Sequence, residues 1–370
     1  MVSETKRTKG ESEVWLGSVM GASVYECGGN KQSHCIRRTY PWFHTVRKSL
    51  FAENESKMKS LQVGDHTLDW GTRTYVMGIL NITPDSFSGD GLLASPYTKI
   101  VNNSKINFAR GAAEAALEQA RQYITAGVDI LDVGGESTRP GSLPINPEEE
   151  RMRVIPVVEA ISKQFPNTLI SIDTYRAVVA EEALQKGAHL VNDIWALRAD
   201  FRLRDVVART GCPVILMHNR GNPASVEIRS QLGNAYIGAE YQDLLEDVKR
   251  ELMESVNLAR AAGISDEHII LDPGIGFGKK IEHNLELINR LNEIRDLGFP
   301  VLLGSSRKSF IGYTLDLPTD QRVEGTAATV AVGIVRGADI VRVHDVEPLM
   351  RVVRMTDALV RKKYRFFIFW

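Results

Sequence analysis

The chain contains the stretch Thr74-Tyr-Val-Met-Gly-Ile-Leu-Asn-Ile-Thr-Pro-Asp-Ser-Phe87, and the rest of the sequence is organised around it. Residues 75–80 form an apolar run of strand length, and the polar residues from Asn81 onward follow without alternation. This pattern predicts a buried strand that delivers a polar tip into a loop. Because later apolar runs also end in polar residues, we expect several strand ends to share one site.

Seven further apolar runs of strand length alternate with helical patterns along the chain. The eight predicted strands cover residues 75–80, 130–133, 169–172, 190–191, 214–217, 269–271, 301–303 and 340–343. The helical patterns between them include residues 112–126, 147–164, 177–186, 241–261, 285–297 and 325–336. Repeats of this kind predict an α/β fold, a parallel (β/α)8 TIM barrel. A doubly wound open sheet is the alternative, but no GxGxxG motif follows the first strand.

Glycines mark the ends of most helical patterns. A glycine suits the residue after a helix because this position takes a left-handed conformation. The predicted caps are Gly127, Gly187, Gly211, Gly263, Gly298 and Gly337.

Three parts of the chain differ in character. Residues 1–60 predict an irregular N-terminal extension or the remnant of a preceding domain, and residues 61–360 hold the barrel. At the start of the barrel, residues 61–70 alternate around Gly64-Asp65, which predicts a hairpin that plugs its lower end. Residues 361–370 form an aromatic C-terminal tail.

Composition excludes several classes of function. The 370 residues are 43% hydrophobic and 25% charged, and 45 basic residues nearly balance 46 acidic ones. No overall field therefore favours nucleic acid or a membrane surface. Three cysteines without a paired spacing argue against a disulfide framework or a zinc site. The sequence contains no run of 18 apolar residues, so we expect no transmembrane helix. We expect a cytoplasmic protein, with a mitochondrial location as the alternative.

Polar residues follow the predicted strands, and in a barrel these strand ends converge on one mouth. They are Asn81, residues 134–139, Asp173 and Thr174, Asn192 and Asp193, His218, residues 272–274, residues 305–308, and Arg342 with His344. The carboxylates and the amide among them suit a flat, nitrogen-rich heterocycle, whereas the arginines, Lys308 and His344 suit an anion. Taken singly, Asp173 has another explanation as a helix N-cap. Together the strand ends predict a binding site.

These residues resemble the dihydropteroate synthase family over about residues 74–358. The similarity rests on Met77-Gly-Ile-Leu-Asn-Ile-Thr-Pro-Asp-Ser-Phe87, Asp132-Val-Gly-Gly-Glu-Ser-Thr-Arg-Pro-Gly-Ser142, Ser171-Ile-Asp-Thr174, Val191-Asn-Asp193, Leu271-Asp-Pro-Gly-Ile-Gly-Phe-Gly-Lys279, Gly304-Ser-Ser-Arg-Lys-Ser-Phe-Ile-Gly312 and Arg342-Val-His-Asp345. The resemblance implies a transferase with Mg²⁺. Its reaction joins p-aminobenzoate to 6-hydroxymethyl-7,8-dihydropterin diphosphate, giving 7,8-dihydropteroate and diphosphate in folate biosynthesis.

The resemblance also implies roles for individual residues. Pterin binding falls to Asp173, Asn192, Met217, Asp272, Gly304 and Lys308. Diphosphate binding falls to Asn81, Arg342 and His344, with Asn81 also the Mg²⁺ ligand. The predicted catalytic residues are Lys308, Arg342, His344 and Asp173. Asp85, Phe87, Thr138, Arg139 and Pro140 would belong to loops that close over p-aminobenzoate, with Ser309 anchoring its carboxylate. The same pocket would be the target of sulfonamides, which mimic p-aminobenzoate.

The reaction implied by the resemblance needs no strong general base. Loss of diphosphate from the pterin methylene leaves a cation that the ring can delocalise, and the aniline nitrogen is already a competent nucleophile. We therefore assign no base. Positive groups would neutralise the charge that develops as the C–O bond breaks.

The sequence departs from a compact barrel in two insertions and the tail. One insertion, of a kind found in eukaryotic and particularly fungal members, falls between Gly91 and Phe108. A second extra segment spans about residues 222–238. We expect a homodimer, as is usual in the family, and small molecules as substrates. The chain could also be fused to, or associate with, hydroxymethyldihydropterin pyrophosphokinase. The alternatives to a dihydropteroate synthase are a pterin-dependent methyltransferase of the corrinoid type and a catalytically silent barrel subunit.

Overall fold

The computed structural model describes residues 58–82, 105–136, 144–220 and 239–361, with backbone alone for 105–112 and for three strands nearer the N-terminus. The chain separates into two units, Met1–Ser56 and Lys57–Trp370. In the first unit, β1 (Val14–Leu16), β2 (Ser23–Gly28) and β3 (Ile36–Thr39) pair as an antiparallel sheet. The sequence pattern did not predict these three strands.

The second unit is a barrel of parallel strands. Its strands are β6 (Tyr75–Asn81), β7 (Ile130–Gly134), β8 (Leu169–Asp173), β9 (Leu190–Asp193), β10 (Val214–Met217), β11 (Ile269–Asp272), β12 (Leu302–Leu303) and β13 (Ile340–Val343). They are hydrogen-bonded in the order β11-β10-β9-β8-β7-β6-β13-β12. A parallel bridge between Leu271 and Val301 joins the two ends of this order. The predicted (β/α)8 barrel is confirmed.

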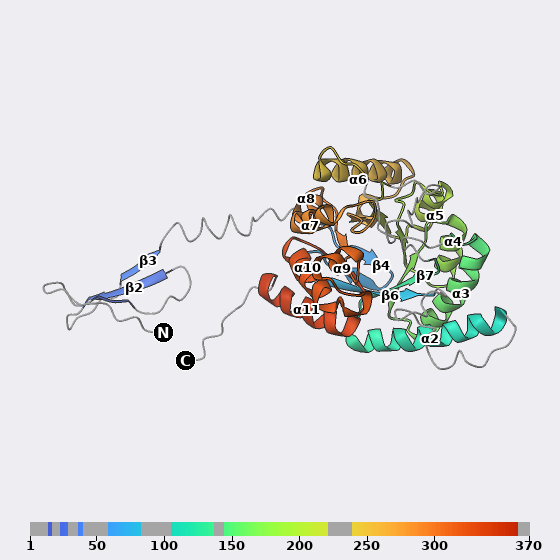
Figure 1. Cartoon of the computed structure of the whole chain (residues 1–370), viewed down its shortest axis with the longest axis horizontal. Helices are drawn as coiled ribbons and strands as arrows, with labels where there is room; N and C mark the ends of the chain where they lie inside the picture. Colours follow the sequence, from blue (N-terminus) through green and yellow to red (C-terminus); the bar gives the residue numbers. More distant parts are fainter. Residues whose placement is uncertain are drawn as a thin grey trace. The chain divides into compact units, whose positions relative to one another are not determined.

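Helices surround the strands (Figure 1). They are α2 (Lys105–Ala126), α3 (Pro147–Gln164), α4 (Ala177–Gln185), α5 (Arg202–Thr210), α6 (Leu244–Ala261), α7 (Ile281–Asn289), α8 (Leu291–Arg295), α9 (Ser309–Leu315), α10 (Val323–Val335) and α11 (Val346–Val360). Several helix boundaries differ from the prediction by a few residues, and two differences are larger. The single helix expected at 285–297 is broken at Arg290 into α7 and α8, and α2 begins at Lys105, inside the predicted insertion. All six predicted cap glycines have positive φ, between 66° and 109°.

Side chains alternate between the two faces of each strand and so divide the core into two parts. Outward-facing residues such as Val76, Leu131 and Ile170 pack against the helices. Inward-facing residues, among them Met77 and Ile130, form a separate apolar cluster inside the barrel. This inner cluster also contains Leu61, Val63 and Leu68 of the hairpin β4 (Leu61–Val63) and β5 (His66–Leu68). The hairpin therefore plugs the barrel as predicted.

No helix among the described residues combines the length and the apolar character needed to cross a membrane.

Candidate active site

Inside the barrel, the apolar layer gives way to polar side chains toward the carboxyl ends of the strands. On β7, Ile130 belongs to the inner apolar cluster, and Asp132 lies two residues further along. On β8, Leu169 is followed at the same spacing by Ser171 and then by Asp173. Because the strand period is two, these residues share the inner face. Polar groups thus line the barrel interior just below its mouth.

An arginine on β13 links two carboxylates across this polar layer. Arg342 donates from Nε to Oδ2 of Asp132 over 2.6 Å and from Nη2 to Oδ2 of Asp173 over 2.7 Å. Asp132 is fully buried, and the side chain of Asp173 is only 14% exposed. Burial raises the pKa of Asp173, Arg342 opposes this rise, and the neighbouring Asp132 adds to it. Asp173 therefore pairs with Arg342 and does not act as a helix cap.

Asp132 also orients the amide of Asn192. The Nδ2 of Asn192 donates to Oδ2 of Asp132 over 3.1 Å, which leaves the amide oxygen of Asn192 available as an acceptor. Among the described residues, Oδ1 of Asp132 and Oγ of Ser171 are buried and have no hydrogen-bond partner. These two residues face each other in the pairing of β7 with β8. Buried polar atoms that lack a partner suit a ligand that brings its own donors.

A second group of predicted pterin residues meets around Gly304. A Cβ built on this glycine would lie 3.8 Å from Oδ2 of Asp272 and 3.9 Å from Nζ of Lys308. Burial raises the pKa of Asp272, whereas nearby Lys308 lowers it. Burial lowers the pKa of Lys308 to about 8, although Asp272 opposes that change. Asp272, which is buried, and Lys308, which is half-buried, thus both border the position of Gly304.

Two of the predicted diphosphate residues, Asn81 and His344, lie at the strand ends, whereas the third, Arg342, belongs to the polar layer described above. Asn81 ends β6, and a Cβ on Gly134 would lie 3.7 Å from its Oδ1 and 3.5 Å from Oδ2 of Asp173. Beyond β13, Nδ1 of His344 lies 3.0 Å from Oγ of Ser306. Val343, between Arg342 and His344, is fully buried in the outer core. The alternation expected along this strand is therefore present.

Some predicted residues cannot be placed. Asp85, Phe87, Thr138, Arg139 and Pro140 lie outside the described residues. Ser309 is exposed at the first position of α9, so its assignment to the carboxylate of p-aminobenzoate stays a prediction. Met217 ends β10 in register with Asp272 and is 3% exposed.

The structure adds Asp132 and Phe277 to the mouth. Asp132 is a charged residue within the apolar run of β7, and its two-residue spacing from Ile130 was the signal that it faces inward. Phe277 lies in the loop after β11, where Nζ of Lys308 is 4.7 Å from the centre of its ring. Its position depends on the fold of a glycine-rich loop, which the sequence pattern does not specify.

A parallel barrel whose mouth holds inward carboxylates, an amide, an arginine and a lysine belongs to the class of (β/α)8 enzymes that bind a flat heterocycle. The family model described as Pterin binding enzyme matches residues 77–344. The dihydropteroate synthase of Clostridium beijerinckii is 46% identical over 82% of this chain and 100% of its own length. A folate synthesis bifunctional protein of Arabidopsis thaliana is 36% identical over 88% of this chain and 64% of its own length. A solved structure of Yersinia pestis dihydropteroate synthase in a sulfonamide drug complex superposes with a TM-score of 0.68, at 38% identity, covering 81% of this chain and 99% of that one.

The chain belongs to the dihydropteroate synthase family. Its activity is accordingly the condensation of 6-hydroxymethyl-7,8-dihydropterin diphosphate with p-aminobenzoate, a transferase reaction.

Proposed function

We propose that the polar mouth of the barrel carries out this condensation, with the pterin ring held inside the barrel and the diphosphate nearer the rim. The convergence of Asp272 and Lys308 on the space at Gly304 is the observation that carries the proposal. A carboxylate and an ammonium side by side match the N–H donors and ring acceptors of a pterin edge. Asn192, with its amide oxygen turned away from Asp132, adds a further acceptor.

Arg342 and His344 would bind the diphosphate as it departs. The guanidinium of Arg342 has five N–H donors in a fixed fork, of which its hydrogen bonds to Asp132 and Asp173 use two, so three remain for phosphate oxygens. Positive charge at this position stabilises the charge that grows on the leaving oxygen. Departure of diphosphate leaves a pterin-stabilised cation, which the aniline nitrogen attacks before it loses a proton. No residue is assigned as a general base.

Mg²⁺ fits the oxygen atoms at the rim. Oδ1 of Asn81 and Oδ2 of Asp173 both border the space that a side chain at Gly134 would fill, and oxygen ligands suit this ion. Among the described residues no group of three or more His, Cys, Asp or Glu side chains forms a metal cluster. Few protein ligands are no obstacle, because Mg²⁺ keeps waters and takes phosphate oxygens. When bound, the ion would supply charge neutralisation for the diphosphate, with Asn81 as its protein ligand.

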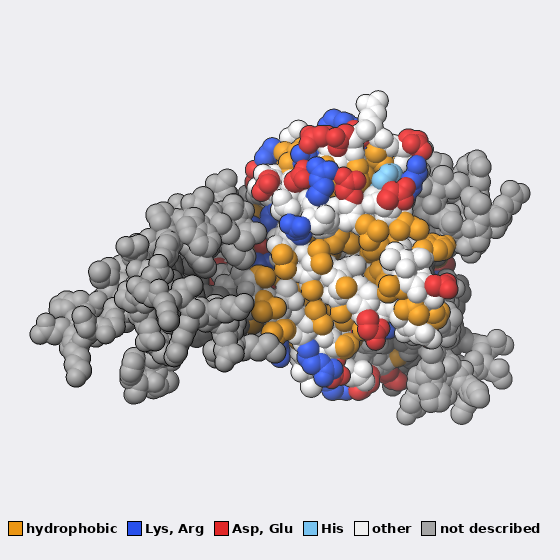
Figure 2. Space-filling view, turned by 60° about the vertical axis from the view of Figure 1, so that its left-hand side comes forward, with side chains coloured by type: hydrophobic (Ala, Val, Ile, Leu, Met, Phe, Trp, Pro, Cys, Tyr) orange, Lys and Arg blue, Asp and Glu red, His pale blue; other side chains and the backbone are white. Residues whose placement is uncertain are grey.

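We propose a homodimer that forms through α10 and α11. Large hydrophobic side chains on these helices are exposed, namely Val332, Val335, Met355 and Leu359, at 43%, 58%, 59% and 64%. Figure 2 shows hydrophobic side chains gathered over one broad face of the molecule. Contiguous apolar surface of this kind is typical of a protein–protein contact. Sedimentation velocity tests the assignment, because Val335→Glu combined with Leu359→Glu should yield monomers.

Two further properties follow from similar proteins. Because the Yersinia pestis relative is solved with a sulfonamide drug, we expect sulfonamides to compete with p-aminobenzoate here. The Arabidopsis thaliana relative is a bifunctional folate synthesis protein, so association with the pyrophosphokinase that makes the pterin substrate is a second expectation.

A turnover assay tests the function. Purified protein, Mg²⁺, 6-hydroxymethyl-7,8-dihydropterin diphosphate and p-aminobenzoate should yield dihydropteroate and diphosphate in equal amounts. A sulfonamide should raise the KM for p-aminobenzoate without changing kcat. Absence of product would contradict the proposal, and methyl transfer that depends on cobalamin would favour the methyltransferase. Lys280→Met, which changes an exposed lysine outside the mouth, is the control and should keep wild-type rates.

A further inference from the structure

A buried lysine behind the mouth holds the loop that separates β11 from α7. Nζ of Lys279 lies 2.9 Å from the carbonyl oxygen of Gly274 and 3.0 Å from that of Phe277. It also lies 2.9 Å from Nδ1 of His218. Lys279 is only 3% exposed, and its neighbour Lys280 is exposed. None of the residue roles that the family resemblance implies falls on Lys279.

The histidine beside Lys279 must act as an acceptor. Nε2 of His218 lies 3.0 Å from Oε2 of Glu251, so Nε2 carries the proton that is donated to this carboxylate. Burial and the nearby Lys279 lower the pKa of His218 to about 3, which keeps the ring neutral. A neutral imidazole with a proton on Nε2 has a lone pair on Nδ1. Lys279 therefore meets three acceptors within 3.0 Å, and a protonated lysine has three N–H groups to satisfy them. The carbonyl oxygen of His218 lies further from Nζ, at 3.5 Å.

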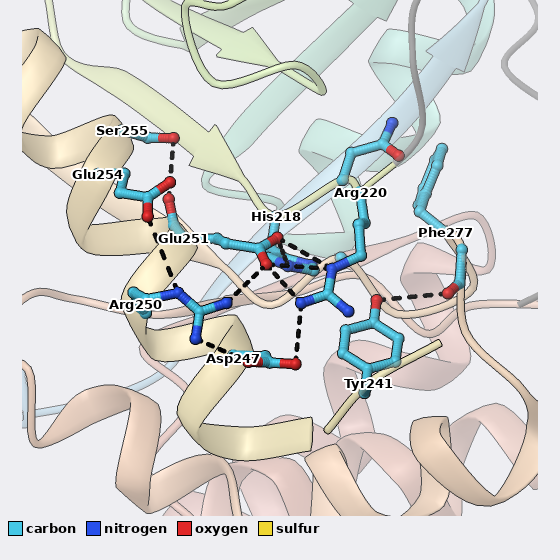
Figure 3. Close-up of polar contacts among 12 residues, drawn as sticks. His218, Arg220, Tyr241, Asp247, Arg250, Glu251, Glu254, Ser255 and Phe277 are labelled. Carbon is cyan, nitrogen blue, oxygen red and sulfur yellow. Dashed lines mark hydrogen bonds and ion pairs between the residues drawn. The ribbon is translucent and has the colours of Figure 1, made fainter. Parts of the chain in front are cut away.

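Charged groups behind His218 fix the carboxylate that orients it (Figure 3). Arg220 donates to Oε1 of Glu251 from Nη2 over 2.5 Å and from Nε over 3.0 Å. Burial alone would raise the pKa of Glu251, but hydrogen bonds from His218 and Arg220 lower it to about 2. Arg220 also lies over the ring of Tyr241, whose hydroxyl donates to the carbonyl of Gly278 over 3.3 Å. The network thus reaches the loop at both of its ends.

The opposite side of the same loop faces the substrate mouth. Nζ of Lys308 donates to the carbonyl oxygen of Ile275, and it lies over the ring of Phe277. A Cβ on Gly276 would fall 2.8 Å from Cδ of Lys308, so the two segments are in close contact. Lys279 holds the loop from behind, and the pterin-binding Lys308 rests on its front.

We propose that Lys279 is a positioning residue for the substrate mouth, fixing the loop Gly274–Gly278 so that Lys308 and Phe277 keep their places. This inference rests on the proposed role of Lys308 in binding the pterin. His218 and Glu251 support it by presenting Nδ1 of the imidazole to Lys279. Loss of the Lys279 donors leaves the Phe277 carbonyl and Nδ1 of His218 without this partner, and the Gly274 carbonyl keeps only the N–H of Phe277, at 3.1 Å. The loop has glycines at three of its five positions and so resists a shift poorly. The loop then shifts, and the Lys308 ammonium shifts with it.

Steady-state kinetics at pH 6.5, on Lys279→Met, Lys279→Arg and the exposed control Lys280→Met, test this proposal. Lys279→Met should raise the KM for the pterin diphosphate about tenfold or more while kcat changes less. Lys279→Arg keeps a charged donor and should recover part of the loss, and Lys280→Met should stay within about twofold of wild type. A folded Lys279→Met enzyme with wild-type KM values would overturn the inference.

A measurement on the wild-type enzyme covers the case in which Lys279→Met fails to fold. The ¹⁵N chemical shifts of the His218 ring should identify a neutral tautomer with the proton on Nε2. A proton on Nδ1 would overturn the inference, because the His218 ring could then accept nothing from Lys279. A wild-type enzyme without turnover would instead refute the proposed function, and the ¹⁵N shifts would still decide the role of Lys279.

Discussion

Nε of Arg342 donates a 2.6 Å hydrogen bond to Oδ2 of Asp132, a carboxylate on a strand two places away in the barrel and wholly shielded from solvent. The same guanidinium pairs with a second carboxylate, that of Asp173. One cation therefore serves two buried anions. Such an arrangement is sensitive to the loss of its single positive partner.

Arg342→Met should destabilise the protein by about 3–5 kcal/mol, because it leaves buried carboxylates without a counter-charge. The loss should shrink as the pH falls. Burial raises the pKa of Asp173 above its ordinary value, and Arg342 opposes this rise. Without Arg342, the Asp173 carboxyl is tolerated in the fold when it is protonated, and it costs stability as the pH rises through its folded pKa.

Denaturant unfolding measured at several pH values checks this prediction. Arg121→Met is the matched control, since Arg121 pairs with Glu118 at the surface, where the two side chains are 50% and 58% exposed. The control should change stability by about 0–1 kcal/mol. If both variants lost the same free energy of unfolding, the stability contributed by the Arg342 ion pairs would not depend on their burial.

Asp173→Asn and Asp272→Asn should each lose most of their affinity for the pterin diphosphate. An amide cannot accept at both oxygens from ring N–H and NH₂ donors, which costs about 1.5–3 kcal/mol for a charged hydrogen bond. Isothermal calorimetry measures the change. Asp266→Asn, in an exposed pair with Arg260, is the control and should bind as the wild type does. Wild-type affinity in both site variants would remove these carboxylates from the pterin pocket.

The barrel was predictable because each repeat carries its own signals. Apolar runs, helical periodicity and cap glycines are local patterns, and residues at strand ends converge through the fold itself. Hence Asp173, Asn192 and Asp272 could be grouped from the sequence alone. The pairing of Arg342 with Asp132 could not, because it depends on which strands are neighbours and on side-chain reach across the barrel. The three acceptors within 3.0 Å of Lys279 include two backbone carbonyls. The direction of a carbonyl cannot be predicted from the residue type.

Lys279 should make stability depend on pH. Burial lowers its pKa from the ordinary value 10.5 to about 7. Several charged or ionisable groups surround it, namely Asp272, Lys308, Glu251, Arg220 and His218. Between the folded and unfolded pKa values, the unfolded chain holds the extra proton, so the free energy of unfolding should rise with pH. The stability contributed is present above the unfolded pKa and is lost as the pH falls through the folded one.

The measurement compares wild type with Lys279→Met between about pH 7 and 9. With each pH unit, the unfolding free energy of the wild type should rise by about 1.4 kcal/mol relative to that of Lys279→Met. Lys308 titrates in both proteins and largely cancels. A difference that does not vary with pH would mean that the three acceptors keep Lys279 protonated throughout this range.

Gly274→Ala should damage the enzyme far more than Gly211→Ala, although the two glycines have nearly the same φ, 69° and 66°. A methyl group at Gly274 would lie 1.9 Å from the backbone oxygen of His218, whereas none of the atoms described lies within 4 Å at Gly211. The His218 backbone cannot give way easily, because its N–H donates to the carbonyl of Asp272 over 2.8 Å. Gly211→Ala should cost about 1–2 kcal/mol, the price of a left-handed residue with a Cβ. Gly274→Ala should cost about 3 kcal/mol or more, since steric overlap adds to that strain.

The two variants also separate stability from catalysis. Gly274→Ala pushes the loop away from His218, so Phe277 and the Lys308 that rests on Ile275 should move and the KM for the pterin diphosphate should rise. Gly211 ends α5, away from the mouth, so its variant should keep wild-type KM values despite a lower melting temperature. Thermal unfolding and steady-state kinetics on the same preparations provide both readings. If Gly274→Ala were as stable and active as Gly211→Ala, the close approach of this loop to His218 would be wrong, and with it the geometry that surrounds Lys279.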